Sequence, residues 1–216
     1  MDIGQFLVRR RSLPALASAW SALGFGADPV RAETTRRLTP DQILGPFYPV
    51  GKAPDMSGDL TRIAGHVRSA MGPVLLLSGQ VITTSGEPIA GARIEIWQAN
   101  AAGRYAHPGD TNPAPLDPDF EGFGVAITDA NGRYHFKTVR PAPYPTGPTS
   151  TRPAHIHFQV QSKADRLVTQ MYFEGDPYNA QDRFLQSVRR PEALTVKLAP
   201  VESGANAATF DIIMRA

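Results

Sequence analysis

The chain of 216 residues contains no cysteine, which limits both its cross-links and its metal chemistry. Disulfides are excluded, as are zinc–thiolate and iron–sulfur sites, so any metal ion must be held by His, Asp, Glu or Tyr. An excess of one charge is also missing, because 22 Lys and Arg nearly balance 20 Asp and Glu. No basic run after residue 37 resembles a nucleic-acid-binding stripe, so we expect no nucleic-acid partner.

Signals for helices are sparse, whereas turn-forming residues are abundant. The chain has 20 prolines and 19 glycines, and 42% of it is hydrophobic. This composition is typical of a globular domain built from short strands joined by turns. One short helix is predicted to begin within residues 39–42, with Thr39 as its N-cap and Pro40 at its first helical position.

The region from about residue 75 onwards has the alternation of β-strands. "ARIEIWQ" (92–98) alternates polar and apolar residues, and "TDANGRYHFKTV" (128–139) predicts a hairpin around Asn131-Gly132. Short strands with turns at this density predict a mainly β fold, a sandwich or a barrel, with few short helices. The remaining predicted strands are "VLLLSGQVIT" (74–83), "AHIHFQVQ" (154–161), "RLVTQMYF" (166–173), "ALTVKL" (193–198) and "ATFDIIM" (208–214).

Residues 1–32 differ in kind from the rest of the chain. The run Arg9–Arg11 precedes an uncharged stretch at 12–27, and small residues stand at Val30 and Ala32. This pattern is typical of an export signal, and the stretch is shorter than the ~20 residues that span a bilayer. It resembles a twin-arginine signal, although arginine and serine stand where an apolar residue usually follows the pair. We predict a periplasmic protein without a membrane segment in its mature form; the alternative is a cytoplasmic protein with an N-terminal arm.

"RPAHIHFQV" (152–160) places His155 and His157 two positions apart on a predicted strand. Side chains alternate along a strand, so both imidazoles point to one face, with roughly 6.5–7 Å between their Cα atoms. Such a pair can bind one metal ion, or it can be two polar residues satisfied by their neighbours. The motif alone does not choose between these interpretations, and it names no reaction.

Two long irregular stretches, 99–124 and 140–154, each carry a tyrosine. Loops of this length in a compact domain are usually functional or disordered. Tyr144 stands between two prolines, which restrict the backbone on both sides and suit a side chain that must be aimed. Tyr105 lies in a loop of small and polar residues. A lone loop tyrosine is more often a packing residue, so the residues alone leave both roles open.

Longer motifs give the chain a resemblance to a known family. In order they are "GPFYP" (45–49), "GDLTR" (58–62), "IEIWQANAAGRYAHPGD" (94–110), "PLDPDFEGFG" (115–124), "TDANGRYHFKTVRPAPYP" (128–145), "RPAHIHFQV" (152–160) and "LVTQMYFEGDP" (167–177). From about residue 39 to its end the chain resembles the intradiol ring-cleavage dioxygenases, most of all the iron-bearing β-type subunit of the protocatechuate 3,4-dioxygenases. The resemblance implies an antiparallel, prealbumin-like β-sandwich over 74–216 with long active-site loops, preceded by an N-terminal arm over 33–73.

The resemblance also implies a metal centre. It makes Tyr105, Tyr144, His155 and His157 the protein ligands of a non-haem Fe(III). Ferric iron favours anionic oxygen, and a phenol with an ordinary pKa near ~10 loses its proton when such an ion binds it. Four protein ligands leave a position open, as a catalytic rather than a structural site requires.

The implied reaction inserts both atoms of O2 into a catechol-type aromatic diol and gives a cis,cis-muconate. Arg152 lies at the position of the family's active-site arginine, where a fixed guanidinium can stabilise the carbanion-like form of the bound ring. Gln170 matches a glutamine near the pocket, where it either assists the chemistry or bonds to a loop. His135 matches no ligand position and is expected to be exposed.

Two departures from the family affect the substrate cavity. The segment between Tyr144 and Arg152 is two residues shorter than in the protocatechuate enzymes, and Thr146 stands where an aromatic residue is common. The preferred catechol is therefore left open, as is a homo-oligomeric assembly, and the sequence identifies no cation for a substrate carboxylate. The alternative from another class is a non-catalytic prealbumin-like binding module, which the presence of all four ligands and Arg152 disfavours. A cupin-type enzyme using only the histidines leaves both tyrosines unexplained.

Overall fold

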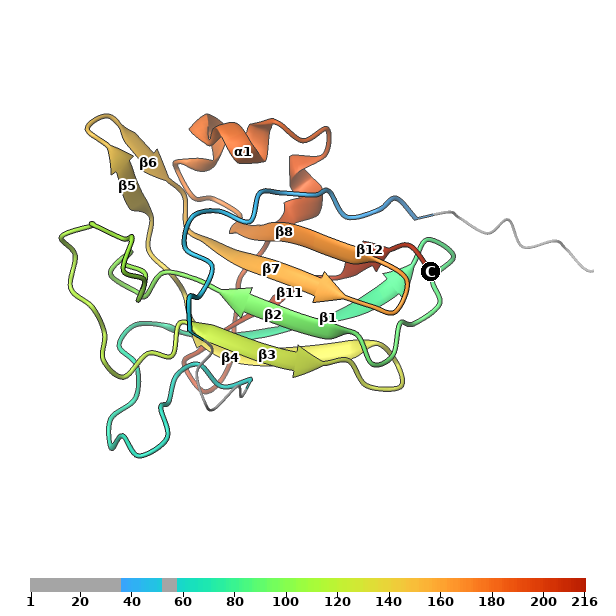
Figure 1. The fold of residues 1–216 in the computed structure, drawn as a ribbon, viewed down its shortest axis with the longest axis horizontal. Coiled ribbons are helices and arrows are strands. Elements are labelled where there is room, and N and C mark those ends of the chain that lie inside the picture. The colour runs from blue at the N-terminus through green and yellow to red at the C-terminus, as the bar shows by residue number, and fades with distance from the viewer. Residues whose placement is uncertain (1–35, 52–57) are drawn as a thin grey trace, which may run out of the picture. The chain divides into compact units, whose positions relative to one another are not determined.

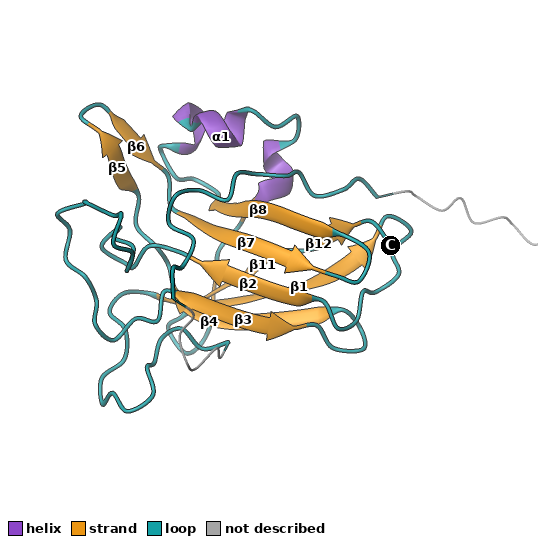
Figure 2. Ribbon diagram, viewed as in Figure 1, coloured by secondary structure: helices purple, strands orange, loops and turns teal. Residues whose placement is uncertain are grey.

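The computed structural model describes residues 36–51 and 58–216, in which two five-stranded sheets stack face to face (Figure 1). The predicted export signal over 1–32 lies outside the described residues. Strands dominate the described chain, and the few helical turns gather beside one sheet (Figure 2). Within the described residues, no helix is long and apolar enough to cross a membrane. The predicted mainly β sandwich with few short helices is confirmed.

The first sheet is built around β1 (Val74–Thr83), the longest strand. On one side β1 pairs antiparallel with β4 (Arg133–Val139), and on the other it pairs parallel with β11 (Asn206–Thr209) and then β12 (Ile212–Met214). Strand β10 (Ala199–Pro200) extends the sheet beyond β11. The long strand β1 therefore pairs with two short C-terminal strands, one after the other along its length.

The second sheet carries the predicted His pair. Its order is β3 (Phe123–Ile127), β2 (Arg93–Trp97), β7 (His155–Gln161), β8 (Arg166–Phe173) and β9 (Thr195–Val196). All neighbours are antiparallel except the pair β8 and β9, which is parallel. The sheets are thus mixed rather than wholly antiparallel. The parallel strands β9, β11 and β12 are each joined to their partners by longer connections and not by tight hairpins.

Five short elements stand at the margins of the two sheets. Strands β5 (Tyr144–Gly147) and β6 (Ser150–Arg152) form a separate hairpin before β7. Between β8 and β9 lie the helical turns η1 (Asn179–Gln181), α1 (Arg183–Gln186) and η2 (Pro191–Leu194). Figure 1 shows the hairpin and α1 at neighbouring corners of the molecule.

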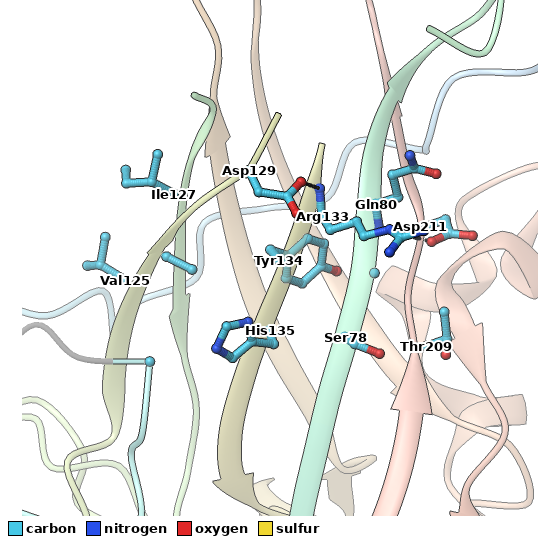
Figure 3. Close-up of a pocket in the computed structure, with 13 residues that line it drawn as sticks. Ser78, Gln80, Val125, Ile127, Asp129, Arg133, Tyr134, His135, Thr209 and Asp211 are labelled. Carbon is cyan, nitrogen blue, oxygen red and sulfur yellow. Dashed lines mark hydrogen bonds between the residues drawn. The ribbon is translucent and has the colours of Figure 1, made fainter. Parts of the chain in front are cut away.

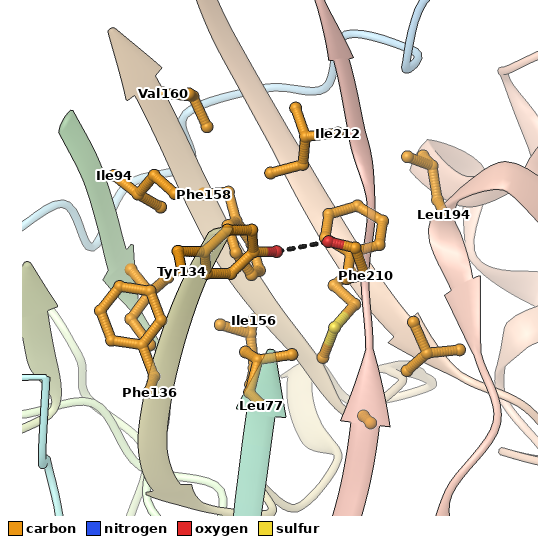
Figure 4. Packing of buried hydrophobic residues seen from close by; sticks show 14 of the residues in the cluster. Leu77, Ile94, Tyr134, Phe136, Ile156, Phe158, Val160, Leu194, Phe210 and Ile212 are labelled. Atoms are coloured by element: carbon orange, nitrogen blue, oxygen red, sulfur yellow. Dashed lines mark hydrogen bonds between the residues drawn. The ribbon is translucent and has the colours of Figure 1, made fainter. Parts of the chain in front are cut away.

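The core lies between the two sheets, where apolar side chains of both inner faces interdigitate (Figure 4). Ile94 and Phe158 from one sheet meet Leu77 and Phe136 from the other, and all four are almost completely buried. The one polar group in the picture, the Tyr134 hydroxyl, donates to the Phe210 carbonyl oxygen. Burying such a hydroxyl with a partner avoids the cost of an unsatisfied polar atom.

The predicted hairpin over 128–139 is wrong, although its turn exists. Gly132 adopts φ 72° and its N–H donates to the Asp129 carbonyl. The strands on either side of this turn belong to different sheets, since β3 pairs with β2 and β4 pairs with β1. The turn therefore crosses between sheets, which stack about 10 Å apart. Turn chemistry reports that the chain reverses but not which strands pair.

The predicted helix at 39–42 is also wrong. This segment is extended, and its backbone groups bond to strands instead of to one another. Thr39 exchanges hydrogen bonds with Ile213, and the Gln42 N–H donates to the Val168 carbonyl at 2.8 Å. Tertiary partners for the backbone override a local capping signal in a segment too short to form a stable helix alone.

Candidate metal centre

The candidate site lies at one end of the second sheet, where β2 ends and β7 begins. The register pairs Trp97 with His157, and His155 starts β7. In Figure 1 the long loop after β2, the β5–β6 hairpin and the N-terminal chain before residue 51 all gather at this end. Strands thus supply the rigid part of the site, and loops close over it.

Four side chains that the sequence singled out come together here. The imidazole centroids of His155 and His157 are 4.9 Å apart, and the rings of Tyr105 and Tyr144 meet edge to face at 5.5 Å. The Tyr144 ring lies 5.6 Å from that of His155, and the Tyr105 Oη atom lies 3.4 Å from His155 Nε2. All four side chains are buried, with exposed fractions of 6% or less.

His155 presents a defined nitrogen to the site. Its Nδ1 lies 2.7 Å from the Pro153 carbonyl oxygen, so Nδ1 carries the proton and donates it there. Nε2 is left with a lone pair directed at the Tyr105 hydroxyl and at Arg152. Burial, and then the nearby Arg152 charge, lowers the pKa of His155 well below its usual value. The ring is therefore neutral, as a metal ligand must be.

His157 is held between Trp97 and Gly45. Its ring stacks on the Trp97 ring at 4.9 Å with planes only 9° apart. Burial lowers the pKa of His157 well below its usual value, so this imidazole is also neutral. Its Nδ1 is buried without a hydrogen-bond partner among residues 36–51 and 58–216. An orphaned buried nitrogen costs about 1–3 kcal/mol unless something binds it.

The two tyrosines are protonated in this environment. Burial is the main cause that raises the pKa of Tyr105 well above its usual value, and it also raises the pKa of Tyr144. Arg152 opposes the rise in both, because a nearby positive charge favours phenolate. A multivalent cation acts in the same direction far more strongly, so phenolate at this position requires a bound metal.

Arg152 is fixed beside these groups by a network of buried partners. The β5–β6 register sets it directly opposite Tyr144. Its Nε and Nη2 donate to the Asp182 carboxylate at 2.8 and 3.3 Å, and its Nη1 lies 3.2 Å from His155 Nε2. Burial is the largest single influence and lowers the pKa of Arg152, but the hydrogen bond to Asp182 and the nearby Tyr172, Tyr144 and Asp182 groups together outweigh it and raise the pKa above the usual value. The guanidinium is therefore charged, and its hydrogen bonds fix its orientation.

Asp182 is the site residue that sequence reasoning missed. It is buried and forms the N-cap of α1, accepting the Leu185 N–H at 2.8 Å. The Asp before a short helical pattern was readable as a cap, but its second role, holding Arg152, depends on contacts across 30 residues. The carboxylate thereby couples the position of α1 to that of the arginine.

Gln170 lies beneath Arg152 rather than in the cavity. It is completely buried, and its Oε1 accepts from Arg152 Nη2 at 3.0 Å and from the Tyr172 hydroxyl at 3.0 Å. Its Nε2 donates to the Ile43 carbonyl at 2.9 Å. The geometry thus shows the bond to a loop, which was one of the two alternatives, together with a hydrogen bond that supports Arg152.

An open cavity of about 570 Å³ reaches Tyr144 and Arg152 from outside. It is large enough for a small aromatic molecule, and much of its wall is apolar. The walls come from the N-terminal arm, the loop after β2, the β5–β6 hairpin and α1, including Ile43, Phe47, residues 109–113, Thr146, Arg183 and Phe184. Tyr144 is therefore the one of the four grouped residues that borders this cavity.

A larger hollow, of about 700 Å³, lies elsewhere, over β1, β4 and β11 of the first sheet and the neighbouring strand β3 of the second (Figure 3). It is lined by Arg133, His135 and Asp211, and it contains none of the predicted site residues. His135 is exposed, as its alternation with buried Tyr134 and Phe136 predicts. The larger of these two hollows is therefore not the one that borders the candidate metal centre.

The donor set fits a ferric ion. Two tyrosine rings and two neutral imidazoles lie side by side, with ring centroids 4.9 to 5.6 Å apart. One imidazole nitrogen has no partner among the described residues, and the second imidazole is oriented by a backbone carbonyl, as in known metal-bound histidines. A metal that took the His155 Nε2 lone pair would remove one hydrogen bond from Arg152. The arginine would keep its bonds to Asp182, Gln170 and Tyr172.

Gly45 is predicted to be required for the position of His157. It has φ +77°, and a Cβ added there would lie 2.9 Å from His157 Cε1. Gly45→Ala should lower the free energy of unfolding by about 1–2 kcal/mol through backbone strain and should reduce metal content by displacing the imidazole. Denaturant unfolding and metal analysis measure the two effects. Gly51→Ala is the matched control, because nothing lies within 4 Å of its Cβ position; equal effects in both variants would contradict the assignment.

Comparison with known proteins identifies relatives over most of the chain. The family model described as "Dioxygenase" matches residues 43–216. The beta chain of protocatechuate 3,4-dioxygenase from Burkholderia cepacia is 40% identical over 202 residues, which cover 86% of this chain and 85% of the relative. Hydroxyquinol 1,2-dioxygenase from a Rhizobium species is 31% identical over 195 residues, 84% of this chain but only 63% of the relative, so the chain spans less than two thirds of that protein.

Solved structures of similar fold include 3-chlorocatechol 1,2-dioxygenase from Rhodococcus opacus, with TM-score 0.67 and 27% identity over 84% of this chain and 74% of that one. The dioxygenase domain of a carbohydrate-binding fusion protein from Streptomyces sp. SirexAA-E has TM-score 0.64 and 28% identity, covering 83% of this chain and 99% of that domain.

Proposed function

The chain belongs to the intradiol ring-cleavage dioxygenase family, and on that basis we propose that it binds Fe(III) and cleaves a catechol-type diol to a cis,cis-muconate. The bond between the two hydroxyl-bearing ring carbons breaks, and both atoms of O2 enter the product. The observation that carries the proposal is the convergence of two buried tyrosines and two neutral histidines next to an open cavity.

Tyr105, Tyr144, His155 and His157 are the residues that would hold the iron. When bound, Fe(III) supplies a Lewis acid that stabilises the deprotonated diol and draws electron density from its ring. The hydrogen bond from His155 Nδ1 to Pro153 and the stacking of His157 on Trp97 keep both imidazoles in place. The protein thus contributes a preformed ligand set.

Tyr144 is the group that an incoming diol meets, because it borders the cavity and Tyr105 is not among the residues that line it. A diol that bound through both oxygens would give up two protons; the Tyr144 phenolate oxygen would accept one of them, and the other would leave to solvent through the open cavity. The raised pKa of Tyr144 in its buried position makes its neutral form stable once it has that proton.

Arg152 holds a fixed positive charge beside Tyr144 and His155. Its bonds to Asp182, Gln170 and Tyr172 leave it little freedom, so it would need no reorganisation to stabilise negative charge on a bound ring. Phe47 covers Tyr105, since the Phe47 ring packs 4.7 Å from the ring of that tyrosine. These are the roles that the chain's own residues have in the proposed reaction.

The first test is a visible absorption spectrum of the iron-loaded protein before and after anaerobic addition of catechol or 3,4-dihydroxybenzoate. A tyrosinate-to-iron band that shifts with a diol, followed by uptake of one O2 and a product two oxygen atoms heavier, is the expected result. A protein that stays colourless after iron reconstitution would leave the non-catalytic binding module as the better description.

Export and assembly are further parts of the proposal. The arginine run and the uncharged stretch within residues 1–32 support a periplasmic location. The relative from Burkholderia cepacia is named as a beta chain, which supports assembly with further subunits, identical or different.

A further inference from the structure

The charged residues that line the 570 Å³ cavity differ in how they are partnered. Three lining side chains carry charge: Asp110, Arg152 and Arg183. Their hydrogen bonds decide which of them is free to bind an ion in the cavity. A buried charge whose donors or acceptors are already used has little to offer a ligand.

Asp110 is used by the protein itself. It is buried, one carboxylate oxygen accepts the Tyr105 N–H at 2.7 Å, and the other accepts the Asn112 N–H at 2.8 Å. These bonds shape the loop that carries Tyr105. The carboxylate is therefore a structural group whose charge is offset by backbone donors.

Arg152 is likewise committed. Its donors go to the Asp182 carboxylate, to Gln170, to the Tyr172 hydroxyl and to His155. Its positive charge is balanced by Asp182 at salt-bridge distance in a buried setting. It serves the reacting end of the cavity, and only its Nη1 donor, which faces His155, would become available if a metal took that nitrogen.

Arg183 is the exception. Among the described residues its guanidinium makes no hydrogen bond or ion pair, and its side chain is exposed at the cavity wall. The guanidinium carbon lies 4.6 Å from the centroid of the Phe184 ring. Stacking on an aromatic face holds the planar group while leaving its in-plane N–H donors free, which is the arrangement that recognises carboxylates in a bidentate manner.

We propose that Arg183 is the anion-recognition residue of the cavity, and that the chain prefers catechols bearing a carboxylate over unsubstituted catechol. This inference rests on the proposed function, because it assigns the far end of the same substrate. The diol end meets Tyr144 and Arg152, the ring lies between apolar walls that include Ile43 and Phe47, and the carboxylate reaches Arg183. The cation that the sequence did not reveal comes from α1, about 30 residues beyond Arg152.

The substitution that tests this is Arg183→Gln, with Arg189→Gln as the matched control. Arg189 is exposed on the same segment, and it is not among the residues that line the cavity. We expect Arg183→Gln to weaken anaerobic binding of 3,4-dihydroxybenzoate, and to lower kcat/KM for it, by about 10- to 100-fold, the usual contribution of a hydrogen-bonded charge. Catechol binding and turnover should change less than 2-fold, and the control should leave both unchanged.

The position of the carboxylate is resolved by a second pair of probes. 3,4-Dihydroxyphenylacetate has one more carbon between ring and carboxylate than 3,4-dihydroxybenzoate, so the probe with the larger loss on Arg183→Gln has the better length. Arg183→Glu should reverse the preference towards 3,4-dihydroxyphenethylamine, whose ammonium group then meets a carboxylate.

Outcomes that overturn the inference differ from those that overturn the function. A wild-type protein that binds catechol as tightly as 3,4-dihydroxybenzoate, or an Arg183→Gln variant that loses both equally, rejects Arg183 as the anion-recognition residue while ring cleavage stands. Loss of colour and of O2 uptake with every diol rejects the function. Because the binding measurement needs no turnover, it judges Arg183 in that case as well.

Discussion

Tyr144→Phe is expected to lower kcat by at least ~100-fold and to weaken the visible band of the iron-loaded protein. The change removes one oxygen from a buried ring and leaves the packing against Phe47 and His155 intact. Groups that merely support a metal ligand cost about 10–100-fold when they are mutated, so loss of a ligand should cost no less. Steady-state O2 uptake and the absorption spectrum measure the two effects.

Two controls separate this effect from general damage. Tyr134→Phe makes the same chemical change in the core, where the hydroxyl bonds only to the Phe210 carbonyl, and should cost about 1 kcal/mol of stability without loss of colour. His135→Ala removes an exposed imidazole beside the other hollow and should leave colour and turnover intact. An equal loss of colour and turnover in Tyr144→Phe and His135→Ala would contradict the assignment of the site.

Asp182→Ala is expected to lower the free energy of unfolding by about 3–5 kcal/mol, which is the usual cost of breaking a buried ion pair. Both partners are buried, with side-chain exposures of 8% for Arg152 and 3% for Asp182, so the arginine left behind would be an uncompensated charge. Lys137→Gln breaks an exposed pair with Asp59 at 3.2 Å and should cost less than about 1 kcal/mol. Urea unfolding of both variants measures the difference.

A double substitution separates the structural role of this pair from its proposed role in the reaction. Asp182→Asn keeps an oxygen for the Leu185 N–H at the N-cap of α1. Combined with Arg152→Met it leaves no buried charge, so most of the lost stability should return while turnover stays low. A double variant as unstable as Asp182→Ala would contradict the view that the unpaired charge causes the loss. Restored turnover would contradict the role given to Arg152.

The strands that the sequence predicted best are those with the clearest alternation or the longest apolar run. The segments 74–83 and 166–173 coincide with β1 and β8. Each lies against the core through alternate or consecutive apolar residues, and a one-residue shift would expose that face. Local pattern therefore specifies these strands almost completely.

The errors have a common physical cause. Whether the strands around Gly132 pair with each other, or with β2 and β1, depends on backbone partners far away in the sequence. The same holds for residues 39–42, whose backbone bonds to β8 and β12. Propensity and turn chemistry describe only near neighbours, so tertiary hydrogen bonds decide such cases.

The sequence by itself determined that His155 and His157 share a face, because side chains alternate along any strand. It also singled out both tyrosines, through the long loops that carry them and through motif resemblance. Only the tertiary structure decided what surrounds them. Asp182 holds Arg152 from 30 residues away, Gly45 packs against His157 across more than 100, and Arg183 reaches the cavity from α1. Contacts of this range depend on how the sheets and loops meet, which no local pattern encodes.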